Sequence, residues 1–155
     1  MNDNESSFNS DISSHLTSLH SHLCHFFPAI ERVAVALYQA DSDMLHTYIN
    51  STHGSESPIK HYQVTLDSVP SLKLLAESDQ SRSVDDLSVY KSSSKLHSQA
   101  IIGAGFRSSF TLPMKVNGEL LGFVFFDSKR LAYFGEAEQS YLTLFAQLLF
   151  SYIKH

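Results

Sequence analysis

Four histidines and the single cysteine lie close together near the start of the chain. These residues are His15, His20, His22, Cys24 and His25. Imidazole and thiolate groups bind zinc and other transition metals, but a metal or haem site needs several of them to converge on one point. On one helix His22 and His25 are neighbours, whereas His15 lies two turns from His22, so two ligands are conceivable and four are not. We therefore predict no metal site and place these histidines on solvated helix positions, although a second copy of the chain could bring pairs together.

Other patterns that carry chemistry are incomplete. Serine is abundant, but the sequence lacks the Gly-x-Ser-x-Gly motif whose turn positions the nucleophilic serine of many hydrolases. The sequence therefore does not indicate a hydrolase. The glycines at 103 and 105 do not continue as a dinucleotide-binding motif because position 108 is Ser108. We predict that they end a helix. The sequence thus favours a protein that is not an enzyme.

Length and charge narrow the class of protein. A chain of 155 residues is expected to form one core. Its net charge of −5 does not favour binding to the negatively charged backbone of nucleic acid. The longest apolar runs are far shorter than the roughly 18–20 residues that span a bilayer, and no signal peptide is recognisable. We therefore expect a cytoplasmic segment with no nucleic-acid partner and no membrane contact.

The stretch FTLPMKVNGELLGFVFFDS, residues 110–128, predicts a hairpin. Asn117-Gly118 suits the two central positions of a type I′ turn, so Val116 and Glu119 should pair. The incoming strand alternates between an apolar face and a mixed face, whereas Leu120 to Phe126 contains no polar residue. Such a strand lies mid-sheet with both faces covered. Asp127 is predicted to cap the turn that follows.

The other elements follow from apolar periodicity and breakers. Residues 1–10 are polar and predict a disordered tail; a helix should start with Asp11 as N-cap and stop at Pro28. RVAVALYQA, residues 32–40, predicts a second central strand, with residues 44–51 as its partner. A short strand near residues 61–66, two short helices near residues 68–78 and 94–103, and a helix from Gly135 complete the chain. The weakest region to assign is SRSVDDLSVYKSSSK, residues 81–95.

The first and last helices both carry apolar residues at helical spacing. The first set has the alternating spacing of a heptad seam, which predicts a homodimer through the terminal helices. The predicted seam consists of Ile12, Leu16, Leu19, Leu23, Phe26, Leu142, Phe145 and Leu149.

The order of elements predicts an α+β fold over residues 11–155, in which an antiparallel sheet lies between a helical layer and a layer of connecting segments. GFRSSFTLPMKVNGELLGFVFFDS and YFGEAEQSYLTLFAQLL, residues 105–128 and 133–149, resemble the GAF domain, a small sensory and ligand-binding module of signalling proteins. The resemblance covers nearly the whole chain from Asp11. It implies a PAS-like or profilin-like sheet, a helical face that often dimerises, and a small-molecule pocket on the opposite face.

For that pocket we expect aromatic walls with a few polar anchors from the mixed strand faces and the connecting segments. The candidates are Tyr38, Tyr48, Tyr62, His97, Arg107, Ser109 and Thr111. Arg107 could bind a carboxylate or phosphate, or form a structural salt bridge. The resemblance leaves the ligand and any cofactor undetermined.

Several activities of GAF proteins fit these residues poorly. Free methionine sulfoxide reductases need a nucleophilic thiolate and resolving thiols, which Cys24 alone cannot supply. Cys24-His25 resembles the bilin-anchoring pair of phytochromes but stands before the first strand rather than late in the domain. The Asn-Lys-Phe-Asp-Glu signature of cyclic-nucleotide GAF domains is absent.

The sequence therefore predicts a non-catalytic sensory GAF domain from a larger bacterial signalling protein. It would bind an unidentified small molecule and signal through a dimer of its terminal helices. Two alternatives remain at this point: a structural dimerisation module whose pocket is filled by its own side chains, and a stand-alone enzyme of the free methionine sulfoxide reductase type.

Overall fold

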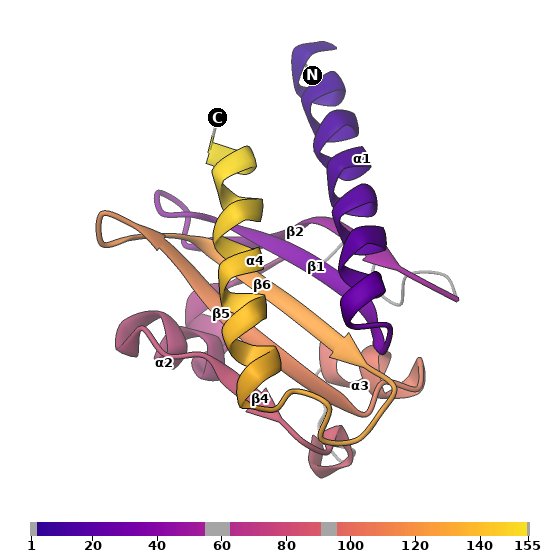
Figure 1. Ribbon diagram of the computed structural model, residues 1–155. Helices are drawn as coiled ribbons and strands as arrows, with labels where there is room; N and C mark the ends of the chain where they lie inside the picture. Colours follow the sequence, from indigo (N-terminus) through magenta and orange to yellow (C-terminus); the bar gives the residue numbers. More distant parts are fainter. Residues whose placement is uncertain (1–2, 55–62, 91–95, 155) are drawn as a thin grey trace.

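The protein folds around a six-stranded antiparallel sheet (Figure 1) with the strand order β3-β2-β1-β6-β5-β4. The structure is a computed structural model that describes residues 3–54, 63–90 and 96–154. The strands are β1 (Ile30–Gln39), β2 (Met44–Thr52), β3 (Gln63–Thr65), β4 (Arg82–Val84), β5 (Ser108–Val116) and β6 (Glu119–Ser128). The helices are α1 (Asp3–Phe26), α2 (Pro70–Ser78), α3 (Leu96–Gly103) and α4 (Glu136–Lys154), with short 3-10 turns η1 (Leu66–Ser68) and η2 (Leu87–Tyr90).

The sheet separates two layers, as the α+β prediction requires. On one face α1 and α4 lie across the strands, and both helices extend past the same edge of the sheet (Figure 1). Their buried side chains join those of β1, β5 and β6 in the largest core cluster. On the other face α2 packs on the sheet through Leu72 and Leu75, and a smaller cluster joins η2 to α3 through Leu87 and Ile101.

The β5–β6 hairpin has the predicted turn and faces. Val116 pairs with Glu119, and Asn117 and Gly118 have φ values of 52° and 81°, the left-handed conformation that a type I′ turn needs. The central position of β6 between β1 and β5 explains its apolar sequence, because both of its faces are covered.

Gly122 of β6 lies close against the backbone of the neighbouring strand β1. A Cβ atom at this position would lie 2.0 Å from the backbone oxygen of Ala36. We expect Gly122→Ala to lower the free energy of unfolding by about 1–3 kcal/mol, since backbone rather than a side chain must move. Urea unfolding measures this, with Gly103→Ala as the control because nothing lies within 4 Å of its added Cβ. Equal stabilities of the two variants would contradict the prediction.

The N-terminal helix is longer than predicted. α1 begins at Asp3, so residues 3–10 are helical where the sequence predicts a disordered tail, and Asp11 lies inside the helix rather than at its cap. No proline interrupts this segment, and the acidic side chains Asp3 and Glu5 favour a helix start because they complement the helix dipole.

The sequence does not predict β4 and η2, which lie in the weakly assigned region 81–95. These elements have only three and four residues, which is too short for a readable apolar periodicity.

The predicted dimer seam requires correction. Leu16, Leu23, Leu142 and Leu149 are at most 3% exposed and pack against the chain's own sheet, so no second copy can reach them. Leu19 and Phe145 are half-buried against the same core. Phe26 alone is largely exposed, and the side chain of Ile12 lies outside the described part of the chain. The apolar repeat therefore reflects packing on the sheet.

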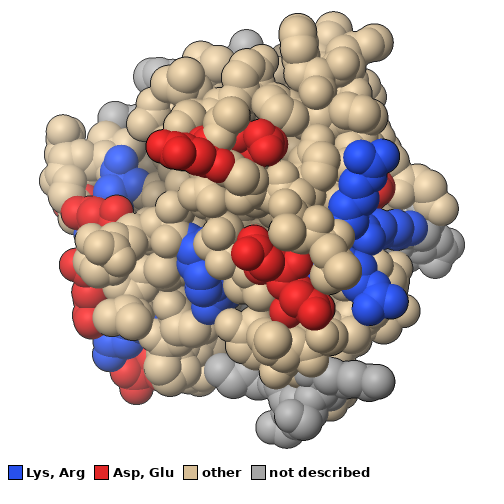
Figure 2. All heavy atoms as spheres, turned by 60° about the horizontal axis from the view of Figure 1, so that its bottom comes forward, with Lys and Arg blue, Asp and Glu red and all other residues tan. Residues whose placement is uncertain are grey.

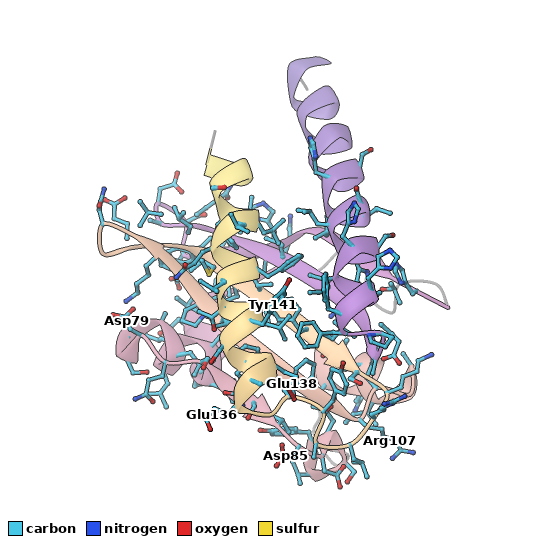
Figure 3. The ribbon with its side chains drawn as sticks, in the orientation of Figure 1. Asp79, Asp85, Arg107, Glu136, Glu138 and Tyr141 are labelled. Atoms are coloured by element: carbon cyan, nitrogen blue, oxygen red, sulfur yellow. The ribbon has the colours of Figure 1, made fainter. Side chains whose placement is uncertain are left out.

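A different set of apolar side chains faces outward. Tyr141, Leu144 and Leu148 follow one face of α4 and are 43%, 63% and 64% exposed. Phe26 of α1 extends this set, because its ring centroid lies 6.1 Å from that of Tyr141. Tyr141 projects from α4 on the side facing α1 (Figure 3). We call these four residues the outer patch.

Candidate functional site

A cavity of about 250 Å³ lies on the face of the sheet opposite α1 and α4. Its floor is formed by β1, β5 and β6, and its walls come from α2, β4, η2 and α3. The lining is mostly apolar and includes Ala34, Leu45, Leu72, Leu87, Ile101 and Phe125. Such a concave apolar site with a few polar groups is the usual form of a small-molecule pocket.

A buried ion pair forms part of the floor. Arg32 of β1 and Asp127 of β6 are 1% and 4% exposed, and a guanidinium N–H donates to the carboxylate over 2.7 Å. The two residues are partners in the register of neighbouring strands, which fixes the contact. Burial raises the pKa of Asp127 above its ordinary value, and the charge of Arg32 opposes this shift.

Two arginines of the cavity lining each have a buried nitrogen without a hydrogen-bond partner among the described residues. Within the described residues, no hydrogen-bond partner is found for the buried Nε of Arg32 or of Arg82, and both side chains line the cavity. Arg82 is held on β4 opposite Thr111 of β5. An arginine fork can bind a carboxylate or phosphate through two parallel hydrogen bonds, so the polar side of the cavity suits an acceptor group. Hydroxyls of Ser98, Ser109 and Thr111 add further donors and acceptors.

The structure brings only some of the predicted pocket residues to this cavity. Ser109 and Thr111 line it and are buried, on the mixed face of β5 that the alternation predicts. Tyr38 does not line it, and its hydroxyl instead donates to Asp43 over 2.7 Å. Hydrogen bonding to the Asp43 carboxylate and burial raise the pKa of this phenol.

Arg107 is exposed and lies near the rim of the molecule (Figure 3), outside the lining. Tyr62 lies outside the described residues, as do the side chains of Tyr48 on β2 and His97 on α3. For these three residues the pocket assignment stays a prediction. Ser98, which follows His97 directly, does line the cavity.

The sequence prediction missed Arg32, Arg82 and Asp127. Asp127 was predicted to cap the turn after β6, but Ser128 does this instead, because its hydroxyl oxygen accepts the backbone N–H of Arg130 over 3.1 Å. A signal was present: Arg32 and Asp127 are opposite charges in two strands that are otherwise apolar and predicted to be central. A charge in such a strand needs a partner, since burying it alone is costly.

The molecular surface shows acidic and basic side chains interspersed with uncharged ones on the face drawn in Figure 2. Among the helices that the structure describes, none combines the length and the hydropathy required to cross a bilayer.

Comparison with known proteins agrees with this architecture. The model of the GAF domain family matches residues 12–151. No curated protein sequence matches the chain. Among solved structures, the chain is similar to a GAF domain/HD domain protein from Geobacter sulfurreducens, with a TM-score of 0.68, 17% identity, and coverage of 95% of this chain and 94% of that one.

Two other similar structures are those of a reductase and of a chromophore-bound domain. One is a type II free methionine-R-sulfoxide reductase from Thermoplasma acidophilum, with a TM-score of 0.67, 14% identity, and coverage of 95% and 94%. Another is a phycoerythrobilin-bound GAF domain from a cyanobacterial phytochrome, with a TM-score of 0.67, 16% identity, and coverage of 94% of this chain and 84% of that one. At such identities the likeness concerns the fold. Because the family model spans most of the sequence, the chain belongs to the GAF domain family.

Proposed function

We propose that this GAF domain is a non-catalytic sensor that binds a small metabolite in the cavity and transmits its occupancy through the terminal helices. The observation that carries the proposal is the mostly apolar cavity lined by Arg32 and Arg82, each of which has a buried Nε without a partner among the described residues. A ligand with an apolar body and a carboxylate, phosphate or carbonyl group would pack against the apolar lining and accept hydrogen bonds from the arginines. An open cavity also favours a ligand over a pocket filled by the protein's own side chains.

The size of the cavity favours a compact ligand. Its volume of about 250 Å³ is below the 300–1,000 Å³ that is typical of pockets for drug-sized molecules. Cys24, the only cysteine, is carried by α1 on the other face of the sheet. A covalent chromophore on this thiol would therefore not lie in the cavity. The same separation argues against thiol chemistry on a ligand bound there, in contrast to the similar reductase.

Transmission through the terminal helices requires a contact that ligand binding can change. The outer patch supplies four exposed apolar side chains on α1 and α4. We propose that it is the homodimer interface, in place of the buried residues of the predicted seam. The sheet connects the two sites, because β1 and β6 contact the cavity on one face and α1 and α4 on the other. Coupling between them requires two states that bind the ligand with different affinity.

A thermal-shift screen of carboxylates and phosphates tests the ligand. A compound at a hundredfold excess over its Kd should raise Tm by roughly 5–10 °C in a chain of this length. Ala34→Leu should abolish the shift, because Ala34 lines the floor and the larger side chain would occupy the cavity. Ala137→Leu, at an exposed position of α4, is the control that should respond like the wild type. A shift that persists in a cooperatively folded Ala34→Leu variant would place the ligand elsewhere.

A further inference from the structure

A second group of chemically active side chains lies away from the cavity, where α1 meets the ends of β1 and β2. His20 and Cys24 come from successive turns of α1, and His53 follows β2 directly. One ligand atom from each of the three residues lies within 4.8 Å of the other two. Cys24 Sγ and His53 Nδ1 are 3.6 Å apart. The long-range pairing of α1 with β2 thus adds a third ligand that the sequence of the helix alone cannot supply.

Both ring nitrogens of the buried His20 form hydrogen bonds, and the partners identify which nitrogen carries the proton. Its Nε2–H donates to the backbone carbonyl of Ile30 over 2.7 Å, and a carbonyl can only accept, so the lone pair lies on Nδ1. At present Nδ1 is 2.8 Å from the Ser51 hydroxyl. Burial lowers the pKa of His20 to about 4, so the imidazole is neutral at neutral pH. A hydrogen bond from the second ring nitrogen to a carbonyl is the usual support of a metal-binding histidine.

His53 and Cys24 complete the group from its more accessible side. The ring of His53 stacks on that of His20, with centroids 3.9 Å apart and planes inclined by 19°. The backbone N–H of His53 donates to the carbonyl of Glu31 over 2.8 Å, which holds this residue beside β1. Both His53 and Cys24 are half-buried, so an ion could reach them from solvent.

The donor set and its spacing suit zinc. Zn–S and Zn–N bonds of about 2.3 and 2.0 Å in a tetrahedron place sulfur and nitrogen about 3.5 Å apart, close to the Cys24–His53 separation. The remaining ligand atoms must draw together by on the order of 1 Å, with rotation of the stacked rings. Two imidazoles and one thiolate form a borderline-soft set that zinc favours over magnesium or calcium. Burial and the nearby Glu31 carboxylate raise the pKa of Cys24, so binding would release the thiol proton.

We propose that His20, Cys24 and His53 bind one Zn²⁺ ion, with the fourth position left to water or an external ligand. This site is independent of the cavity, since it lies on the other face of the sheet. Because it joins α1 to the β1–β2 hairpin, bound zinc would stabilise the docking of this terminal helix.

The test is titration of the chelator-treated protein with Zn²⁺ by calorimetry, together with Co²⁺ as a spectroscopic substitute. We expect one ion per chain and a thiolate-to-cobalt charge-transfer absorption. Cys24→Ser should remove that absorption and weaken zinc binding by more than the roughly 10–100-fold that loss of a residue hydrogen-bonded to a metal ligand costs. His53→Gln should weaken binding similarly, and it provides a second variant should Cys24→Ser fail to fold.

His22→Gln and His25→Gln are matched controls, because both histidines are exposed on the same helix outside the cluster. They should bind zinc like the wild type. The proposal is overturned if the protein binds no zinc, if folded Cys24→Ser and His53→Gln bind it as the wild type does, or if only the control variants lose binding, which would indicate a surface site.

Discussion

Replacing Asp127 by alanine is expected to lower the free energy of unfolding by about 3–5 kcal/mol. The change leaves the Arg32 guanidinium, 1% exposed, without its counter-ion in the middle of the sheet. An arginine remains charged at any ordinary pH, so the buried charge cannot be removed by deprotonation. Urea unfolding monitored by circular dichroism measures the loss.

Two comparisons show whether the loss arises from the isolated charge. The double variant Arg32→Met/Asp127→Leu should recover much of the stability, because replacing both charges by apolar groups removes the desolvation cost as well as the attraction. Asp67→Ala breaks an exposed ion pair with Lys73 and should change stability little. If Asp127→Ala were no more destabilising than Asp67→Ala, the buried pair described above would be wrong.

Changing Leu144 and Leu148 together to glutamate is expected to convert a dimer into a monomer. Full burial of one leucine side chain contributes about 1.5–3 kcal/mol, so the loss of two should raise the Kd of the dimer at least about a hundredfold. Repulsion between the new glutamates in the interface should weaken the dimer further. Sedimentation velocity over a concentration series measures the change. Both positions are more than 60% exposed, so the fold of the single chain should persist.

The control for the outer patch is Leu74→Glu. Leu74 is also 63% exposed but belongs to α2 on the other face of the sheet. It should leave the dimer unchanged. A wild-type protein that is monomeric at all concentrations, or a dimer that survives both glutamates, would contradict the proposed interface.

Much of the fold could be predicted because local signals agree with the tertiary structure. The Asn117-Gly118 turn sets the pairing of Val116 with Glu119 and of Lys115 with Leu120, beyond which a bulge shifts the register by one residue. The alternation along β5 matches the structure, in which Thr111 lines the cavity and Leu112 joins the core under the helices. The absence of polar residues from Leu120 to Phe126 correctly places β6 mid-sheet. In these cases the alternation of residues that are close in the sequence indicates which faces of the strand are buried.

The site was harder to predict because its parts meet only through long-range pairing. Arg32 and Asp127 are 95 residues apart in the sequence, and their contact depends on β1 pairing with β6. The heptad spacing of α1 shows that one face is buried but not what covers it. Leu16 and Leu23 are covered by the chain's own sheet rather than by a second helix. Likewise His53 joins His20 only when β2 packs beside α1.

The most direct test of the proposed sensor function is native mass spectrometry of the purified protein after incubation with a small-metabolite extract, beside the same sample denatured. The account predicts a non-covalent adduct of one small molecule per chain that is lost on denaturation and absent from Ala34→Leu. Its mass would identify the ligand class. A wild-type spectrum without any adduct, or an adduct that Ala34→Leu retains in equal amount, would contradict the assignment of the cavity as the ligand site.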